Sequence, residues 1–406
     1  MLVPVKDVLH LVFDGLEQPI ALVDCRHLFD HLPLIFRGWH IEASPDDTQP
    51  PILTLRLEKS TYVLEADWLK KTIRRTDQVD AICGLAANLV RFYVRGNADL
   101  LCLYGAAAKF TGRLVVFPSK SRAGKSVLSA CIAAAGIQLY CDDVLPISIV
   151  EGHGIAPGLA PRLRIPLPDN LSPESREFIQ TRKGLEGKQY LYLDLDSDHL
   201  AARGSQAAVG AFILLEREEG APLSLEVISE AEVLHRVVWQ NFARKAEAPR
   251  ILERLSQLVS HAQRFRLCYD RAEDAIALLK ETFEAWPTES VQAPDTRFTT
   301  AQDSIRPPHV PPGCYLRKPE IRIVTIDGES FLADTQGATI HHLNPVGSAI
   351  WTQLAEPVTM ADLVDLLHLA FPDVGGEQVK GDLATLIDTL VSKNLLVVGS
   401  NQAKIL

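Results

Sequence analysis

The chain has 406 residues, enough for two or three domains, and 47% of them are hydrophobic while 23% are charged. Acidic residues outnumber basic ones by 51 to 41, which gives a net charge of −10 and argues against a general nucleic-acid-binding protein. No apolar run reaches the length of a transmembrane helix, and Lys6 and Asp7 interrupt the N-terminal run, so we expect neither a membrane span nor a signal peptide.

The seven cysteines contain no CxxC pair, and most of them lie within apolar runs. Buried free thiols of this kind are typical of a reducing compartment. The spacing gives no support to a structural zinc site. We therefore expect a cytoplasmic protein.

Residues 1–100 read as an N-terminal α+β region, to which we assign no chemistry, and residues 101–286 as the main domain of the body. Hydrophobic periodicity predicts helices over 63–71 and 79–93 and helical stretches within 232–262. Short apolar runs predict strands at 101–103, 114–117, 137–141, 190–195 and 211–215. This mixture predicts an α/β body.

The most informative segment is 114–143, which reads LVVFPSKSRAGKSVLSACIAAAGIQLYCDD. A β-branched run leads into a loop that ends in Gly124-Lys125-Ser126. A helix follows, Gly136 stands where a helix C-cap glycine belongs, and a second apolar run ends in Asp142-Asp143. This order predicts a βαβ unit with two parallel strands.

Such a loop binds phosphate because backbone N–H groups and the helix dipole both point at the anion. In the sequence pattern of phosphate-binding loops, Lys125 reaches the β- and γ-phosphates and the Ser126 hydroxyl ligates Mg²⁺. Asp142 and Asp143 should face the same crevice, one to hold Mg²⁺ and the other to orient or deprotonate an attacking hydroxyl. We therefore predict a nucleotide site formed by Ser119, Lys120, Ser121, Arg122, Ala123, Gly124, Lys125, Ser126 and Val127.

The pattern GxxxxGK[ST] asks for glycine where this chain has Ser119. The alternative interpretation is an ordinary βαβ turn with a chance GKS. The strand, the helix cap and the paired aspartates all agree with the motif, and we prefer the nucleotide site.

Asp142 follows Lys125 by only 17 residues, on the very next strand. This arrangement resembles the HPr kinase/phosphorylase family, whose phosphate-loop helix leads directly to a strand that ends in Asp-Asp. The resemblance extends upstream to Leu103-Tyr104-Gly105, where the family has Leu-His-Gly, and downstream to GIAPGLAPRLRIPLP at 154–168.

The resemblance implies phosphoryl transfer from ATP to a serine or threonine hydroxyl, with Mg²⁺. By position, Asp142 matches the general base of the family, while Asp143, Ser126 and Lys125 match its metal and phosphate ligands. Tyr104 replaces the family histidine, and the metal-binding glutamate of the family has no clear match. These departures bear on the reverse, phosphorolysis reaction more than on kinase activity. HPr kinases are hexamers, so the resemblance leaves a homo-oligomeric state of this protein as an open alternative.

Arg162 and Arg164 alternate within a strand-like run and should face one side together. On that side they can clamp a phosphate or the acceptor peptide. The alternative is a solvated edge strand.

Residues 287–319 are rich in proline, which interrupts both helices and sheets, and predict a linker to a small domain at 320–400. In that domain Asp327-Gly328 signals a tight hairpin, while Asn344 with Pro345, and Thr359, are helix-start signals. The pattern predicts strands at 321–326, 330–334, 339–343 and 395–398 and helices at 345–354, 361–370 and 378–393. Their order suggests a winged-helix-like α+β module.

Residues 315–398 hold five basic and eleven acidic residues, which argues against DNA as the partner. The run HHLNPVGSAIW at 341–351 and the leucine-rich end after Gly381 resemble the PqqD family. That resemblance implies a recognition element for ribosomally made, post-translationally modified peptides, which takes the leader of a precursor peptide as an added strand. By this interpretation the sheet edge is 339–343 and the groove wall is the helix 378–393.

The two resemblances together predict a kinase that phosphorylates a serine or threonine of a precursor peptide, as similar kinases do for lasso peptides. One rival is a regulatory kinase acting on a folded protein, which should keep its activity when residues 321–406 are deleted. The other is a nucleotide-gated peptide carrier, which should yield no phosphorylated product.

Overall fold

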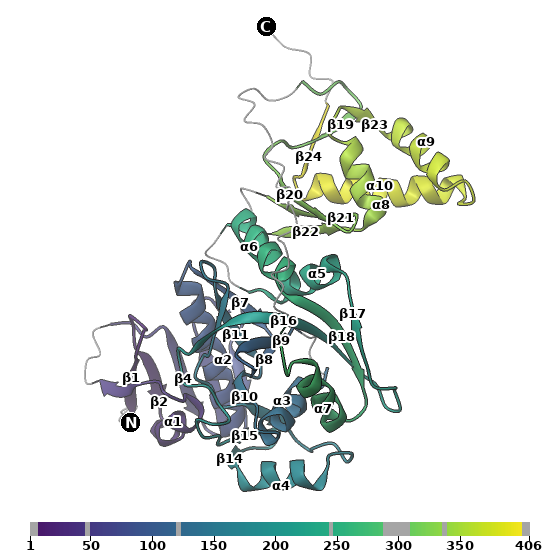
Figure 1. The fold of residues 1–406 in the computed structure, drawn as a ribbon. Helices are drawn as coiled ribbons and strands as arrows, with labels where there is room; N and C mark the ends of the chain where they lie inside the picture. The colour runs from purple at the N-terminus through teal and green to yellow at the C-terminus, as the bar shows by residue number, and fades with distance from the viewer. Residues whose placement is uncertain are drawn as a thin grey trace. The chain divides into compact units, whose positions relative to one another are not determined.

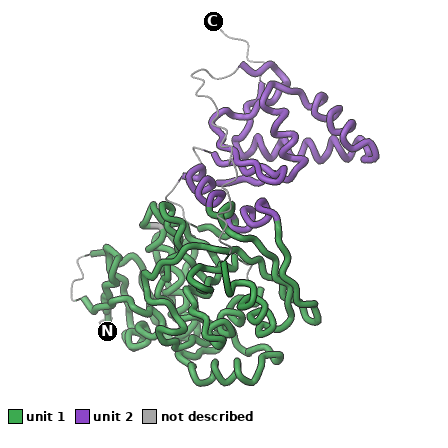
Figure 2. The backbone as a smooth tube through the Cα atoms, viewed as in Figure 1, with its two compact units in different colours: residues 1–228, 239–245, 258–292 green, residues 229–238, 246–257, 293–406 purple. Residues whose placement is uncertain are grey.

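The computed structural model describes residues 7–44, 49–118, 123–242, 247–286, 309–334 and 339–399. Two compact units make up the chain (Figure 2). The larger unit comprises residues 1–228, 239–245 and 258–292, and the smaller comprises residues 229–238, 246–257 and 293–406.

The first part of the larger unit is a six-stranded sheet in the order β3-β1-β2-β4-β5-β6. Figure 1 labels its strands β1, β2 and β4. The apolar face of the sheet packs in one core with the long helix α2 (Gln78–Gly96), which Asp77 caps by accepting hydrogen bonds from the N–H groups of Val79 and Asp80. The strands are β1 (Val8–Phe13), β2 (Ile20–Val23), β3 (Ile41–Ser44), β4 (Leu53–Glu58), β5 (Thr61–Glu65) and β6 (Ile73–Arg75), with the short helices η1 (Arg26–His31) and α1 (Leu32–Ile35) after β2.

The helix predicted over 63–71 is wrong. Its first residues belong to β5, which pairs antiparallel with β4 in a hairpin. Lys59 supplies a left-handed residue (φ 57°) at the turn. The β-branched and aromatic residues of TYVLE suit a strand, and pairing with β4 decides between the two structures. The helix predicted over 79–93 is confirmed as α2.

The second part of the larger unit is a nine-stranded mixed sheet. Its main path is β10-β8-β9-β16-β12-β11-β7, and β18 and β17 continue from β16. The long strand β16 runs parallel to β9 and β18, and the other pairs are antiparallel. The strands are β7 (Leu100–Tyr104), β8 (Ala106–Phe110), β9 (Arg113–Phe117), β10 (Gln138–Cys141), β11 (Val144–Ser148), β12 (His153–Ile155), β16 (Gln206–Arg217), β17 (Ser224–Val227) and β18 (Gln263–Tyr269).

The predicted βαβ unit is present with one difference. The helix α3 (Lys125–Ala134) connects β9 to β10, but β8 lies between these two strands and pairs antiparallel with both. The two strands therefore run in the same direction without being neighbours. Gly136 ends the helical segment with a positive φ of 75°, as predicted. The expected α/β class with a mixed sheet is confirmed.

The helix α3 packs between α4 (Pro173–Thr181) and α7 (Ala272–Thr282), and its buried face contributes to the core around Phe117 and Ile213.

A separate three-stranded sheet in the order β13-β15-β14 follows the βαβ unit in the chain. Its strands are β13 (Arg162–Arg164), β14 (Lys183–Glu186) and β15 (Tyr190–Leu193). The chain region predicted as helical over 232–262 forms α5 (Glu230–Gln240) and α6 (Ala248–Ser260).

The C-terminal domain in the smaller unit contains two three-stranded sheets and three helices, which confirms the α+β prediction. The sheets have the orders β23-β19-β24 and β20-β21-β22. Trp351 is 1% exposed at the centre of the core. The elements are β19 (Cys314–Arg317), β20 (Arg322–Ile326), β21 (Glu329–Ala333), β22 (Ile340–Leu343), α8 (Pro345–Gln353), β23 (Val358–Thr359), α9 (Met360–Ala370), α10 (Gly376–Ser392) and β24 (Leu396–Val398).

The local signals of this domain are confirmed one by one. Asp327 and Gly328 both have positive φ (52° and 80°), as the predicted hairpin turn requires. The Asn344 side chain accepts from the Gly347 N–H, and Thr359 forms a reciprocal capping box with Asp362. Because β19 pairs with β24, the domain includes residues before position 320. Most of the predicted linker, residues 287–308, lies outside the described part of the chain.

Candidate functional site

The site is built around the N-terminus of α3. Gly124, immediately before the helix, has a left-handed backbone (φ 84°, ψ 1°). A Cβ atom at this position would lie 3.0 Å from the Tyr269 hydroxyl oxygen and 3.2 Å from Cδ of Arg217. Both the backbone angle and the lack of space therefore require glycine. The first N–H groups of an α-helix point out of its N-terminus, and in many proteins such groups bind an anion.

The predicted loop is described only at its end. Ser119, Lys120, Ser121 and Arg122 lie outside the described residues, so their contacts with phosphate stay predictions. Ala123 is described and packs against the core beside α3 without lining the pocket.

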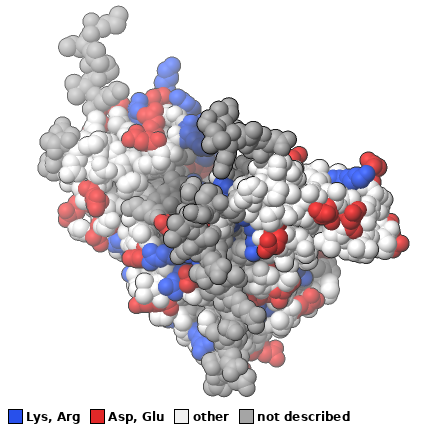
Figure 3. Space-filling view, turned by 90° about the horizontal axis from the view of Figure 1, so that it is seen from above, with Lys and Arg blue, Asp and Glu red and all other residues white. Residues whose placement is uncertain are grey.

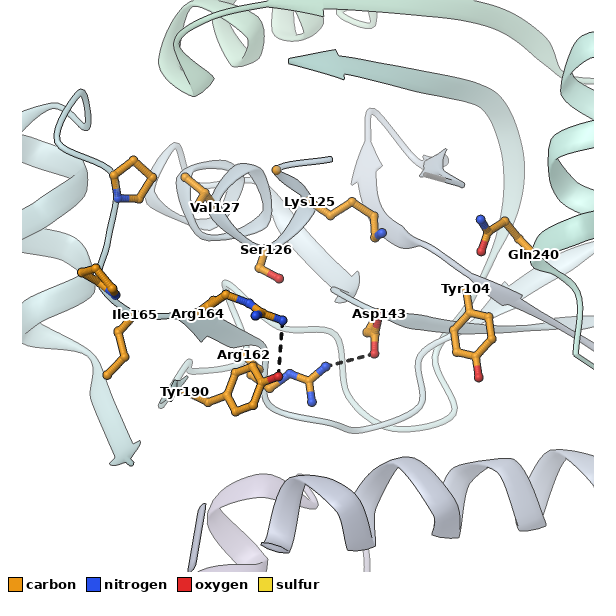
Figure 4. A pocket seen from close by; sticks show the side chains of 13 residues that line it. Tyr104, Lys125, Ser126, Val127, Asp143, Arg162, Arg164, Ile165, Tyr190 and Gln240 are labelled. Atoms are coloured by element: carbon orange, nitrogen blue, oxygen red, sulfur yellow. Dashed lines mark hydrogen bonds and ion pairs between the residues drawn. The ribbon is translucent and has the colours of Figure 1, made fainter. Parts of the chain in front are cut away.

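A pocket of about 700 Å³ opens in front of the helix (Figure 4). It is lined by side chains from the start of α3, the end of β10, strand β13 and strand β15. Lys125 and Ser126 come from α3, and Asp143 follows β10. The other lining residues are Tyr104, Gly124, Val127, Arg162, Arg164, Ile165, Pro166, Pro168, Tyr190 and Gln240.

The two aspartates after β10 differ in their surroundings. Asp143 lines the pocket, whereas Asp142 is 7% exposed and is absent from the lining. The Asp142 carboxylate accepts a 2.9 Å hydrogen bond from the backbone N–H of Arg162. Both carboxylates were predicted to face one crevice. The two residues form the bend between β10 and β11, and only Asp143 lines the open pocket, so the prediction that both face it is wrong for Asp142.

Burial, together with the neighbouring charge of Asp143, raises the pKa of the Asp142 carboxyl to about 6. The charge of Arg162 and its N–H bond act in the opposite direction. A carboxylate with a pKa in this range is a stronger base than an ordinary aspartate and is still ionised at neutral pH.

The two arginines of β13 lie on the pocket together, as their alternation predicts. Arg162 forms an ion pair with Asp143 (Nη2 to Oδ2, 3.2 Å) and lies 4.8 Å from the centroid of the Tyr190 ring. Arg164 donates to the Tyr190 hydroxyl at 3.4 Å (Figure 4). Arg162 also contacts the buried Cys83 Sγ. These contacts hold two cations beside the helix N-terminus.

Tyr104, which stands where the HPr kinase family has histidine, is held from two sides. The Arg91 guanidinium of α2 donates to its hydroxyl and lies 5.6 Å from its ring centroid. The Phe242 ring lies 4.3 Å from it on another side. The hydroxyl is thus engaged by Arg91, and in Figure 4 it points away from Lys125 and Ser126.

Several residues of the site were not found from the sequence. Tyr190 and Cys83 hold Arg162, and Arg91 holds Tyr104. Tyr190 begins a strand that was predicted, but nothing in a single sequence pairs that strand with β13. Arg91 is the one basic residue of the predicted helix 79–93, but nothing in the sequence connects it to Tyr104.

The oxygen ligands of the pocket fit Mg²⁺. The Asp143 carboxylate and the Ser126 hydroxyl both line it, and Mg²⁺ is usually held by one or two protein oxygens together with substrate phosphates. Among the described residues there is no group of three or more His, Cys, Asp or Glu side chains that would hold a metal ion by themselves.

A second candidate site lies in the C-terminal domain. Strand β22 ends its sheet, so its outer edge is unpaired within the described residues. Beside that edge is a groove of about 570 Å³ between β22, α8, α9 and α10. It is lined by His342, Leu343, Asn344, Val346, Gly347, Ile350, Leu367, Asp382, Leu383 and Leu386. An open strand edge next to an apolar groove suits an extended peptide.

Residues 329–396 match the family Coenzyme PQQ synthesis protein D (PqqD). The C-terminal domain is a PqqD domain. The resemblance found in its motifs is thereby confirmed, and the open edge and the groove beside it both belong to this PqqD domain.

Two solved structures are similar to parts of the chain. The structure of TbiB1 in complex with the TbiA(beta) leader peptide shares 30% identity over 20% of this chain and 93% of that chain, with a TM-score of 0.19. The Hpr(Ser) kinase/phosphatase from Coxiella burnetii shares 14% identity over 45% of this chain and 99% of that chain, with a TM-score of 0.23. No curated protein matches the chain.

Within the described residues, none of the helices combines the length and the apolar character needed to cross a membrane. On the face shown in Figure 3, the described Lys and Arg side chains stand in small groups among Asp and Glu. The described residues of that face form no broad basic field of the kind that binds a nucleic-acid backbone.

Replacing Gly124 by alanine tests the geometry at the start of α3. The added Cβ would meet Tyr269 and Arg217 and adopt a left-handed backbone, so we expect a loss of about 1–3 kcal/mol in the free energy of unfolding. We also expect the affinity for a fluorescent ATP analogue to fall at least about tenfold, because the helix N-terminus shifts.

Gly112→Ala is the matched control for this variant. Gly112 also has a positive φ of 88°, but a Cβ there meets no atom within 4 Å. It should lose only the backbone contribution, about 1 kcal/mol, and keep its nucleotide affinity. Equal affinities of the two variants would contradict the assignment of Gly124 to a phosphate site.

Proposed function

We propose that this protein is a peptide kinase, which transfers the γ-phosphoryl group of ATP to a serine or threonine hydroxyl of a ribosomally made precursor peptide. The observation that carries the proposal is the convergence of Lys125, Ser126, Asp143 and the two β13 arginines on one pocket at the N-terminus of α3. An apolar ligand pocket does not need this set, whereas a polyphosphate does.

In this proposal, the N–H groups at the start of α3 and the Lys125 ammonium bind the phosphates. Arg162 and Arg164 extend the positive wall of the pocket along β13. Ser126 and Asp143 would hold Mg²⁺, whose role when bound is to neutralise charge on the phosphate oxygens. The side chains of the pocket are fixed by neighbours such as Tyr190, which favours a defined orientation of the phosphates.

Asp142 is the proposed base, and this role requires the acceptor hydroxyl to reach its buried carboxylate beside Asp143 and Arg162. The acceptor oxygen forms a bond to the γ-phosphorus, the bond between that phosphorus and ADP breaks, and the hydroxyl proton passes to the Asp142 carboxylate. Its raised pKa suits this role at neutral pH. Because the carboxylate accepts the N–H of Arg162, the base is also fixed relative to the strand that carries the two arginines.

The PqqD domain is proposed to hold the leader of the precursor as a strand added to β22, against α10. The open strand edge and the adjoining groove support this role. Because the two functions share one chain, a bound leader raises the local concentration of the acceptor. The seven cysteines are all free, which supports the reducing environment of the cytoplasm as the place of this reaction.

The test is the intact mass of a candidate precursor peptide, encoded beside this protein, after incubation with Mg²⁺ and ATP. Wild-type protein should add one phosphate, and fragmentation should place it on a serine or threonine. Lys125→Ala should slow the reaction at least about a hundredfold. An unchanged mass with the peptide still bound would overturn the proposal and favour the nucleotide-gated carrier.

A further inference from the structure

The groove beside β22 has a distinct distribution of polarity. Its floor and walls are mainly aliphatic, and Asp382 on α10 is the one acidic or basic side chain among the lining residues apart from the imidazole of His342. Val346 is 39% exposed, and Leu386 is partly buried, so apolar surface remains open to an incoming side chain. An aliphatic surface beside a single carboxylate calls for a ligand with matching features.

The carboxylate of Asp382 is available. It is exposed, and within the described residues it takes part in no hydrogen bond or ion pair. On the same helix, Lys380 is paired with Glu377 at 3.3 Å. His342 is likewise engaged, since its Nε2 lies 2.5 Å from the Glu329 carboxylate on β21. Asp382 thus stands apart as an unneutralised charge at the rim of an apolar groove.

Other acidic residues on α9 and α10 add to the negative charge of Asp382. The two helices α9 and α10 carry Asp362, Asp365, Glu377, Asp382 and Asp388 against Lys380 and the imidazole of His368, and Lys393 directly follows α10. A negative field of this kind attracts cationic segments and disfavours acidic ones.

The spacing of Asp382 and the apolar Leu386 along α10 matches that of side chains in an extended peptide. Asp382 and Leu386 are four residues apart on α10, so they lie about 6 Å apart on one face of the helix. In an extended peptide, side chains on one face recur every second residue, about 6.7 Å apart. A strand lying along the groove can therefore present one side chain to Leu386 and the next on that face to Asp382.

We infer that the groove selects an extended peptide segment in which a lysine or arginine stands two positions from a large aliphatic or aromatic residue, with the cation paired to Asp382. The inference rests on the proposed function, because it specifies the leader that the kinase would recognise. The order of the two residues follows the direction in which the peptide pairs with β22, and either order satisfies the geometry.

The test is a selection of random twelve-residue displayed peptides on the intact protein without ATP. Wild type should enrich peptides with a basic residue two positions from a large apolar one. Asp382→Lys should lose the basic preference or exchange it for an acidic one. The matched control is Asp388→Lys, an exposed position on α10 that does not line the groove, and it should enrich the same peptides as wild type.

Affinity gives the second readout. A synthetic peptide from the wild-type selection should bind about fivefold to tenfold more tightly than its version with glutamate in place of the basic residue. Asp382→Lys should reverse this order, and Asp388→Lys should keep it. Enriched peptides without a basic bias, an unchanged preference in Asp382→Lys, or no enrichment at all would overturn the inference.

The outcomes of this experiment can be told apart from those of the kinase test. A precursor that is phosphorylated while no variant changes the selected motif removes the inference about Asp382 and leaves the kinase standing. A selected motif that follows residue 382 without phosphoryl transfer supports the groove and removes the kinase.

Discussion

Replacing Asp142 by asparagine is expected to lower the rate of phosphoryl transfer by a factor of about 10²–10⁴, which is the range for loss of a general base. Asparagine has nearly the same shape, and its amide oxygen can still accept the N–H of Arg162, so strand β13 should stay in place. Initial rates with saturating ATP and peptide would measure the loss. In wild type, the rate should fall as the pH drops through about 6, where the carboxyl takes up a proton.

Asp80→Asn is the matched control. Asp80 is 8% exposed, its pKa is raised by burial, and it lies in the first turn of α2 outside the pocket. This variant should keep the wild-type rate and pH profile. A loss of less than about tenfold in Asp142→Asn would show that Asp142 only positions β13, since the hydrogen bond survives the substitution, and the proton acceptor would then lie elsewhere.

The same variant should separate activity from stability. The folded pKa of Asp142 lies above the value of about 3.9 for an unfolded aspartate. Its contribution to stability is therefore present at low pH and is lost as the pH rises through about 6. Because asparagine never ionises, the melting temperature of Asp142→Asn relative to wild type should be higher at pH 8 than at pH 5. An equal difference at both pH values would contradict the raised pKa.

A structural feature could be predicted from the sequence when the residues that form it lie close together in the chain. Helix caps at Asn344 and Thr359, the Asp327-Gly328 turn and the left-handed Gly136 all depend on residues within a few positions, and all were predicted correctly. The strand β5 was predicted as a helix, because its pairing with β4 outweighs local preference. The insertion of β8 between β9 and β10 is equally non-local, since no pattern within 114–143 involves residues 106–110.

The residues of the site also divide into those placed by local sequence, which were predicted, and those placed by distant contacts, which were not. Lys125, Ser126 and Asp143 lie within one short segment, and the motif in that segment is enough to predict that they share a pocket. The residues that hold the pocket in shape come from distant segments. Arg91 on α2 and Tyr190 on β15 meet the site only through the packing of whole sheets and helices. A single sequence contains no record of such contacts. The grouping of Lys125, Ser126 and Asp143 was therefore easier to predict than the residues that hold the pocket in shape.

Removing the leader from the precursor peptide is expected to lower kcat/KM for phosphorylation by about 10²–10⁴, mostly through KM. In the proposed function the pocket at the start of α3 binds only a short stretch around the acceptor, and leader binding by the PqqD domain would supply the remaining affinity through the covalent link. Steady-state kinetics on intact enzyme, with the full precursor and with the leaderless core peptide, would measure the effect. At saturating core peptide, kcat should stay within about twofold, because the pocket itself is unchanged.

Adding the leader as a separate peptide distinguishes tethering from activation. If the leader acts only by holding the acceptor near the pocket, a free leader cannot help the core peptide, and it should compete with the full precursor. Restoration of the full rate by a free leader would contradict tethering and would mean that occupation of the groove changes the catalytic pocket itself. Equal kcat/KM for the two peptides would remove the leader from recognition and leave a kinase that reads only its acceptor, as the rival regulatory kinase would.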